Sequence, residues 1–246
     1  MSGSAELAAP GPGTAHVWWA RRRDAAGRHA ELLDETERQR LTAYRREEDR
    51  ERFLVGCALA KTVLAGYTGR RPADIRFDRT CGECGQPHGK PIFKDLAHSV
   101  SHSGELVVVA VARAPVGVDV EQLDGRTRAL GGDGDPRALA RLVLAGEERA
   151  ALDAVAPAGR PRAFLVAWTR KEAVTKASGE GLRIPFSDVI VAQDRLVSWP
   201  GPQPPETVSL RDLEAEAGYV AALAVIGPCG TVLARDGSVL LERSDV

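Results

Sequence analysis

The sequence predicts an α+β protein, because helical segments alternate along it with short apolar strands. Two runs, Glu105–Ala112 (ELVVVAVA) and Tyr219–Ile226 (YVAALAVI), are nearly all apolar, which is typical of strands buried on both faces of a sheet. Arg50–Gly66 has a broad apolar face and Ala163–Ser178 contains no proline or glycine, so both are expected to be helices that stop at a glycine. Each half of the chain shows the same coarse order of helix, helix, loop and apolar strand.

Composition places the chain among ordinary globular proteins. It has 246 residues, of which 43% are hydrophobic and 27% charged, enough for one large domain or two small ones. The net charge of −1 gives no reason to expect nucleic acid, and no apolar run approaches the ~18 residues of a membrane span. Residues 1–14 lack the features of a signal peptide and are predicted to be a flexible leader. A cytoplasmic protein is therefore expected, with its four cysteines reduced or bound to metal.

Local signals define further elements of the N-terminal half. His16–Arg22 (HVWWARR) is predicted to be a strand, and Asp34 is expected to cap a charged helix. Ala73–Phe77 is a candidate short strand. Val116–Glu121 (VGVDVE) follows a turn at Ala114-Pro115, so we expect it to form a hairpin with the apolar strand before it.

The C-terminal half opens with a loop and closes with an extension. Asp124–Pro136 is rich in Gly, Asp and Arg and is predicted to be mobile. Its proline fits the first turn of a helix that runs to about Ala156. Residues 227–246 form the extension, in which VLARDGSVLLE is predicted to be a small hairpin with an Asp-Gly turn.

The stretch Trp168–Leu182 (WTRKEAVTKASGEGL) carries the strongest chemical pattern. On a helix, Trp168, Glu172 and Lys176 recur every fourth residue and lie in one row. A single Glu–Lys pair is most often a solvated ion pair worth only ~0.2–0.5 kcal/mol. A functional interpretation therefore needs a second acidic cluster and an anion on which to act.

Val116–Glu121 supplies a second acidic cluster. Asp119 and Glu121 are two residues apart and point to the same face of the strand, where two carboxylates repel unless a cation or hydrogen bonds compensate. Mg²⁺ is a hard cation that takes such oxygen ligands together with water and phosphate oxygens. Asp119, Glu121 and Glu172 would form a metal site if the helix packs across this strand. The alternative is two solvated carboxylates at a strand end.

A polar turn, Ser101-His102-Ser103-Gly104, is the candidate anion site. Its hydroxyl, imidazole and N–H groups suit a phosphate. Lys90 precedes a proline in an extended loop and could reach a phosphate, although alone such a lysine is most often a surface charge. A Ser–His hydrolase is the rival, but adjacent Ser and His side chains rarely face each other and no G-x-S-x-G motif is present.

Cys81–His88 (CGECGQPH) contains a single Cys-x-x-Cys. A zinc site would take His88 as a third ligand and a distant cysteine, Cys57 or Cys229, as the fourth. Such a site would make the protein a zinc-dependent interaction module. The alternative is an ordinary Gly/Pro loop, and thioredoxin-like chemistry is disfavoured because the motif does not open a helix after a strand.

Together these motifs resemble those of the 4′-phosphopantetheinyl transferases. GVDVE (Gly117–Glu121) and WTRKEAVTKASGEGL, separated by about fifty residues, are similar to the two signature motifs of that family. GKPIF (Gly89–Phe93) followed by SVSHSG (Ser99–Gly104) resembles its upstream coenzyme A-binding motifs. The match spans roughly residues 16–226, and the length is similar to that of the monomeric, two-lobed surfactin-synthetase-activating type.

The resemblance implies a fold and a reaction. The fold would be two similar α+β lobes, residues 15–113 and 114–226, related by a pseudo-twofold with the active site in the cleft between them. A carrier-protein serine would attack the β-phosphate of coenzyme A, receive 4′-phosphopantetheine and release adenosine 3′,5′-bisphosphate. Mg²⁺ would be the cofactor, with Mn²⁺ as an alternative. The partners would be acyl or peptidyl carrier proteins of polyketide and nonribosomal peptide synthases.

The resemblance also implies roles for individual residues. Asp119, Glu121 and Glu172 would hold the metal on the pyrophosphate. Glu172 would in addition accept the serine proton, and Lys176 would neutralise phosphate charge in the transition state. Coenzyme A would be bound by Arg40, Arg52, Lys90, Ser101, His102 and Asp119.

Two positions depart from the family pattern, because Glu37 and Phe53 align where a basic residue and a threonine are found in other members. Carrier proteins of this kind are acidic, so we expect the mobile loop and the helix after it to recognise them. The candidate arginines are Arg126, Arg128, Arg137 and Arg141. The alternative function is a non-catalytic coenzyme A- and carrier-binding module of the same fold, against which the intact acidic residues and Lys176 argue.

Overall fold

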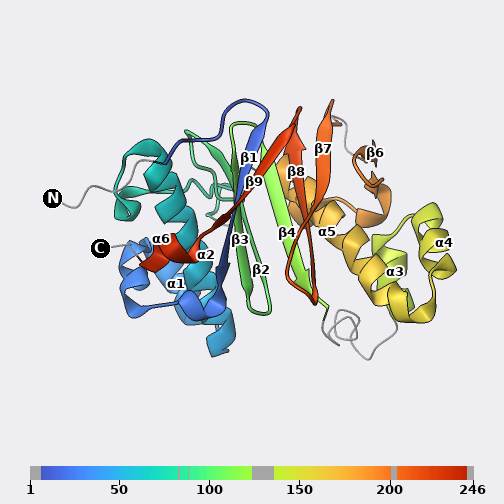
Figure 1. The fold of residues 1–246 in the computed structure, drawn as a ribbon, viewed down its shortest axis with the longest axis horizontal. Helices are drawn as coiled ribbons and strands as arrows, with labels where there is room; N and C mark the ends of the chain where they lie inside the picture. The colour runs from blue at the N-terminus through green and yellow to red at the C-terminus, as the bar shows by residue number, and fades with distance from the viewer. Residues whose placement is uncertain (1–6, 83, 88, 124–135, 201–203, 243–246) are drawn as a thin grey trace. The chain divides into compact units, whose positions relative to one another are not determined.

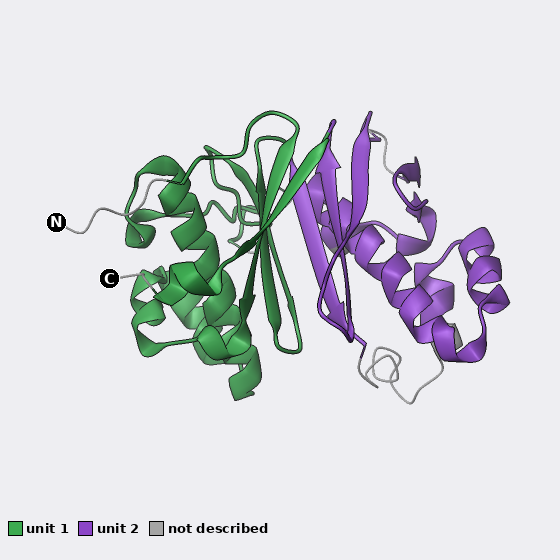
Figure 2. Ribbon diagram, in the orientation of Figure 1, with its two compact units in different colours: residues 1–114, 229–246 green, residues 115–228 purple. Residues whose placement is uncertain are grey.

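The computed structural model divides into two compact units (Figure 2). The first comprises residues 1–114 and 229–246, and the second comprises residues 115–228. The structure describes residues 7–82, 84–87, 89–123, 136–200 and 204–242. Both units combine a sheet with helices (Figure 1), which confirms the predicted α+β class. None of the helices in these ranges is long and apolar enough to cross a membrane.

The first unit is built on a four-stranded sheet in the order β2-β3-β1-β9. Its strands are β1 (Thr14–Arg21), β2 (Ala97–Ser103), β3 (Leu106–Ala112) and β9 (Thr231–Asp236). β3 is central and antiparallel to both neighbours, with Val109 opposite Trp18 on β1 and Val100 on β2. All seven residues of β3 are buried, as its apolar sequence predicts. The strand predicted near His16 is confirmed as β1.

Helix α2 (Glu47–Thr68) covers one face of this sheet, and the shorter helix α1 (Glu35–Ala43) packs against α2. Asp34 caps α1 as predicted, because its carboxylate accepts a hydrogen bond from the Glu37 N–H at 2.9 Å. The apolar face of α2 joins the core with β1 and β3. The helix does not stop at Gly66, as predicted, but continues to Gly69, whose φ of 67° ends it. Short 3₁₀ turns complete the unit: η1 (Arg22–Asp24), η2 (Gly27–Leu32) and η3 (Pro72–Asp74).

Two predictions for this half are wrong. Ala73–Phe77 is not a strand, because Pro72 fixes the φ of a turn and begins η3 instead. The predicted hairpin between the apolar strand and Val116–Glu121 is not formed either. Both edges of β3 are already paired, with β1 and with β2, so the next strand must pair elsewhere.

The second unit is built on a three-stranded antiparallel sheet in the order β4-β8-β7. The strands are β4 (Val116–Gln122), β7 (Val208–Leu213) and β8 (Tyr219–Ile226), and β5 (Ile190–Val191) and β6 (Leu196–Ser198) form a separate pair. The helices are α3 (Pro136–Val143), α4 (Gly146–Ala154) and α5 (Arg160–Ser178), with 3₁₀ turns η5 (Pro157–Gly159), η6 (Gly181–Arg183) and η7 (Phe186–Asp188).

The helix predicted from Pro136 to about Ala156 is in fact two helices. Glu148 accepts a hydrogen bond from the Ala145 N–H at 2.8 Å, which caps a new helix, α4, at its own start. Residues 124–135, most of the predicted mobile loop, lie outside the described residues.

The two sheets repeat one connectivity. In each unit a first strand (β1 or β4) is followed by helices and then by a hairpin (β2–β3 or β7–β8) whose second strand pairs with the first. The longest helix of each unit, α2 or α5, ends at a glycine with positive φ. The coarse repeat in the sequence therefore reflects a shared order of strands.

The C-terminal segment differs from its prediction. Thr231–Asp236 forms β9, which pairs with β1 in parallel, and Ser238–Glu242 forms helix α6, so there is no hairpin. Gly237 turns the chain where a Cβ would lie 2.9 Å from the carbonyl oxygen of Trp19. Leu241 is only 1% exposed and lies in the core of the first unit. This segment is therefore part of the first unit rather than a separate extension.

The leader also makes contact with the first unit. Residues 1–6 lie outside the described residues. The N–H of Leu7 donates to the carbonyl of Gly66 on α2 at 3.0 Å, and the Leu7 side chain packs against that glycine. β1 then begins at Thr14, so the described part of the predicted leader is tied to α2 before the first strand.

Replacing Leu241 by alanine is expected to lower the free energy of unfolding by about 2–5 kcal/mol, because it leaves a cavity in the core of the first unit. Urea unfolding followed by tryptophan fluorescence measures this loss. Val239→Ala is the matched control, since Val239 is 38% exposed on the same helix and should change stability by less than about 0.5 kcal/mol. Equal effects of the two variants would contradict the packing described for α6.

Candidate functional site

Helix α5 lies unusually close to strand β4 at Gly117. A Cβ on Gly117 would lie 2.0 Å from the carbonyl oxygen of Ala173 and 2.5 Å from the backbone nitrogen of Ala177. Only glycine on the strand, facing alanines on the helix, allows the two backbones to approach in this way. The helix therefore packs across β4, as the metal-site hypothesis required.

This approach brings Asp119 to Lys176. Asp119 lies two residues beyond Gly117, on the same face of β4. Lys176 Nζ lies 2.7 Å from Asp119 Oδ1 and donates a second hydrogen bond to the Val118 carbonyl at 3.2 Å. Asp119 is buried, whereas the Lys176 side chain is 27% exposed. The lysine thus compensates a carboxylate that would otherwise be costly to bury.

Glu172 belongs to the same group. Burial raises the pKa of Glu172, the nearby Lys176 ammonium opposes that rise, and the Asp119 carboxylate adds to it. The structure therefore brings Asp119, Glu172 and Lys176 within electrostatic reach of one another. Glu121 follows Asp119 by two residues on the same face of β4 and is partly exposed.

The donor set of this group fits a hard divalent cation. This half-buried site holds two carboxyl groups, Asp119 and Glu172, and one ammonium, Lys176. One ammonium cannot neutralise two carboxylates. Carboxylate oxygens of this kind are the ligands that Mg²⁺ takes in proteins. Among the residues that the structure describes, however, no group of three or more His, Cys, Asp or Glu side chains converges closely enough to hold a metal ion.

In the first unit, Arg52 joins α2 to the predicted anion turn. Arg52 is buried, donates to the Gly104 carbonyl at 2.9 Å and pairs with Asp49. The hydrogen bond from Arg52 is the main reason that the pKa of Asp49 is lowered, and His102 contributes to the same effect. Arg52 and His102 thus both lie within electrostatic reach of Asp49, with Ser101 buried one residue before His102 on β2.

Lys90 lies in the 78–92 loop, which an antiparallel bridge between Asp78 and Ile92 closes, and Arg40 contacts this loop. Arg40 donates to the Pro87 carbonyl at 3.0 Å. Burial lowers the pKa of Lys90 to about 8. The pKa of His98 is lowered to about 3, mainly by burial and in part by the charge of Lys90. Lys90 therefore lies near the first residues of β2.

Glu37, which departs from the family pattern, forms buried ion pairs in the first unit. It is completely buried, and its carboxylate oxygens lie 3.0 Å from Lys61 Nζ and 2.7 Å from Arg79 Nη2. Phe53, the other departure, packs against Tyr44 with ring centroids 5.3 Å apart. A position held in a buried ion network is not available to a nucleotide, so the departure at Glu37 reflects packing.

Sequence reasoning missed three buried cations: Lys61, Arg79 and Lys171. The signal for Lys61 was present, because it is the one charged residue in the apolar run ALAKTVLA. A lysine in such a position must find a buried partner. The sequence could not name that partner, since Glu37 lies on a different helix.

The Cys-x-x-Cys turn is described in part. The Cys81 N–H donates to the Gln86 carbonyl at 2.8 Å, and the Gly85 N–H donates to the Cys81 carbonyl at 2.9 Å. Cys81 and Cys84 are thiols rather than a disulfide. His88, the predicted third zinc ligand, lies outside the described residues.

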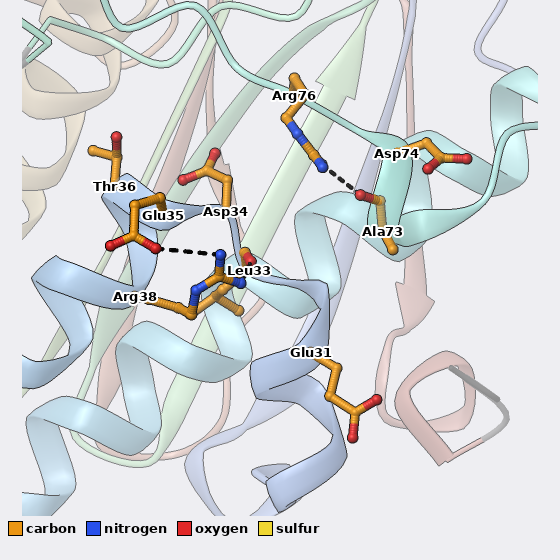
Figure 3. A pocket seen from close by; sticks show the side chains of 9 residues that line it. All are labelled: Glu31, Leu33, Asp34, Glu35, Thr36, Arg38, Ala73, Asp74 and Arg76. Carbon is orange, nitrogen blue, oxygen red and sulfur yellow. Dashed lines mark hydrogen bonds and ion pairs between the residues drawn. The ribbon is translucent and has the colours of Figure 1, made fainter.

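A hollow of about 580 Å³ opens on the first unit between the start of α1 and η3 (Figure 3). Its charged side chains include both signs. Arg38 lies 3.4 Å from Glu35, and Arg76 donates to the Ala73 carbonyl. None of the predicted site residues lines this hollow, so it is unrelated to the predicted chemistry.

Comparison with known proteins identifies relatives along most of the chain. Residues 115–224 match the model of the 4′-phosphopantetheinyl transferase superfamily, and residues 17–114 match that of the 4′-phosphopantetheinyl transferase N-terminal region. A 4′-phosphopantetheinyl transferase of Bacillus subtilis is 29% identical, over 78% of this chain and 81% of the relative. The 4′-phosphopantetheinyl transferase Sfp of the same species is 27% identical over 82% and 85%. HetI of Nostoc, of the same description, is 29% identical over 62% of each.

Glu172→Gln is expected to remove a pH-dependent destabilisation. Because the pKa of Glu172 is raised above its usual 4.5, the stability that this group contributes is complete below about pH 4.5 and is lost as the pH rises through the raised pKa. Glutamine cannot lose a proton, so the Tm of the variant relative to wild type should increase between pH 4 and pH 8. Glu147→Gln on exposed α4 is the control, and an equal pH trend in both variants would contradict the prediction.

Proposed function

Because the chain belongs to the 4′-phosphopantetheinyl transferase superfamily, of the surfactin-synthetase-activating type, we propose the following reaction. The protein transfers 4′-phosphopantetheine from coenzyme A to a serine of an acyl or peptidyl carrier protein of polyketide or nonribosomal peptide synthases. The observation that carries this proposal is the contact of Lys176 with Asp119, beside Glu172, where α5 crosses β4. We also propose that the protein acts as a cytoplasmic monomer.

The reaction breaks a phosphoanhydride bond of coenzyme A and forms a phosphoester bond to the serine. The serine oxygen attacks the β-phosphorus of coenzyme A, and the bond from that phosphorus to the bridging oxygen breaks. Adenosine 3′,5′-bisphosphate leaves with that electron pair, and the serine proton passes to a base. Catalysis of such a step rests on position and on compensation of charge, because little covalent chemistry is required of the protein.

Two residues of α5 fit these needs. Glu172 accepts the serine proton, directly or through water, and its raised pKa brings its basicity closer to that of a working base at neutral pH. Lys176 places an ammonium at the same face and neutralises charge on the transferred phosphate. Mg²⁺, or Mn²⁺, held by Asp119, Glu121 and Glu172 would neutralise charge on the pyrophosphate.

Coenzyme A binding falls to the basic and hydroxyl groups of the first unit. Lys90 and His102 present cationic or hydrogen-bonding groups to its phosphates, with Ser101 beside them on β2. Arg40 is partly exposed, and we propose that it pairs with the adenosine 3′-phosphate. Arg52 is buried under the Ser103–Gly104 turn, so we propose that it binds coenzyme A chiefly by supporting that turn.

The carrier protein would be recognised in part through α3. Arg141 and Leu142 are neighbours on this helix, and Leu142 is 72% exposed. A cation next to an exposed apolar side chain suits an acidic helical bundle. Arg126, Arg128 and the side chain of Arg137 lie outside the described residues.

The reaction is tested by the intact mass of an apo carrier protein after incubation with this protein, coenzyme A and Mg²⁺. We expect a gain of one phosphopantetheine, which disappears with EDTA and falls about 10²–10⁴-fold in rate in Glu172→Gln. Coenzyme A binding without any mass gain, across several carriers, would favour the non-catalytic binding module. Failure to bind coenzyme A would overturn both functions.

The affinity for coenzyme A should fall as the pH rises through 8. Lys90, with a pKa of about 8, loses its charge over that range, so the Kd should increase by up to about tenfold between pH 7 and pH 9. Titration calorimetry measures this change. In Lys90→Arg the guanidinium stays charged and the increase should vanish, whereas Lys94→Arg, at an exposed position, should behave like wild type. A pH dependence that persists in Lys90→Arg would exclude this role.

A further inference from the structure

Lys171, the residue before Glu172, is completely buried and fully engaged. Its Nζ donates to the Val143 carbonyl at 2.8 Å and to the Phe186 carbonyl at 2.9 Å. It also pairs with Glu148 Oε2 at 2.5 Å. An ammonium has three donors, and here each one has an acceptor.

These acceptors come from different segments of the second unit. Val143 ends α3, Phe186 begins η7, and Glu148 lies in the first turn of α4. Glu148 is itself fixed, because it also accepts from the Ala145 N–H at 2.8 Å and the Val191 N–H at 3.3 Å. The lysine therefore ties α5 directly to three neighbouring segments, α3, α4 and η7, and through Glu148 to β5.

Lys171 lies on the side of α5 opposite to the strand. Successive residues of a helix turn by about 100°, so Lys171 lies about 200° from Ala173, which touches β4 at Gly117. Glu172 and Lys176 lie between these two sides. The helix is thus held by backbone contact on one side and by the lysine on the other, which fixes both its height over β4 and its rotation.

The first unit contains the same arrangement. Lys61 on α2 donates to the Ile75 carbonyl, just after η3, at 2.8 Å and pairs with Glu37 at 3.0 Å. Glu37 lies in the first turn of α1 and caps it, as Glu148 does for α4. Lys61 and Lys171 each lie eight residues before the left-handed glycine that ends their helix.

The two arrangements differ in what they support. The residues of α2 that correspond to Glu172 and Lys176 are Thr62 and Gly66, which carry no charge. The buried lysine is therefore a feature of the shared architecture. Of the two helices, only α5 carries ionisable site residues, Glu172 and Lys176, next to the lysine and about one turn after it.

We propose that Lys171, through Glu148 and the carbonyls of Val143 and Phe186, is the positioning residue that holds Glu172 and Lys176 in register with Asp119. The proposal rests on the proposed transferase function for its kinetic consequence. Lys171 itself touches no substrate, because it is enclosed by these partners.

The kinetic test compares Lys171→Met with Lys61→Met, which removes the equivalent lysine from the unit without Glu172. We expect both variants to be less stable, but only Lys171→Met to lose kcat, by about 10²-fold, with little change in the KM for coenzyme A. The acid limb of its kcat–pH profile should also move. Glu148→Gln, which keeps one side-chain oxygen for the Ala145 N–H but loses the charge that pairs with Lys171, should show the same changes to a smaller degree.

A spectroscopic test does not depend on activity. Trp168, one turn before Glu172 on α5, packs against Phe186 with ring centroids 5.3 Å apart. Its near-ultraviolet circular dichroism, isolated by subtraction of a Trp168→Phe variant, should change in Lys171→Met and not in Lys61→Met. A folded Lys171→Met with unchanged kcat, pH profile and Trp168 signal would overturn the proposal. If wild type transfers nothing, the transferase function fails, and the Trp168 signal alone decides whether Lys171 fixes α5.

Discussion

The contact of two backbones at Gly117 is the constraint on which the second unit depends. With no side chain between strand and helix, α5 lies close to β4, and this backbone contact sets the height of the helix over the strand. That approach buries Asp119, and a buried carboxylate must be compensated. Lys176, which lies on α5 about one turn after Ala173, supplies the compensating positive charge. Packing, burial and charge are therefore consequences of one glycine.

Much of this site could be predicted because helices and strands fix which residues share a face. The spacing of Glu172 and Lys176, and of Asp119 and Glu121, identifies their faces without any knowledge of tertiary contacts. The α+β class follows from the apolar runs in the same way. What the spacing cannot give is which faces meet, and the close approach at Gly117 was not foreseen.

The two wrong hairpin predictions and the interpretation of Glu37 share a physical cause, because each involves a partner distant in sequence. Local signals suggested hairpins around Val116–Glu121 and in the C-terminal segment, but β4 pairs with β8 and β9 pairs with β1. Glu37 read as a departure from a nucleotide-binding pattern, yet it faces Lys61 and Arg79 in the interior. A single sequence shows that a buried charge requires a compensating group, but it does not show which residue supplies that group.

Because the chain returns to the first unit at its C-terminal end, the two units are completed in a fixed order during synthesis. The ribosome delivers the whole of the second unit before β9 and α6, whose Leu241 completes the core around α2. Until β9 and α6 are synthesised, one edge of β1 is therefore unpaired and part of the apolar interior of the first unit is exposed. By that time the strands β4 to β8 of the second unit have all been made. The half of the protein that is made first is the half that is finished last.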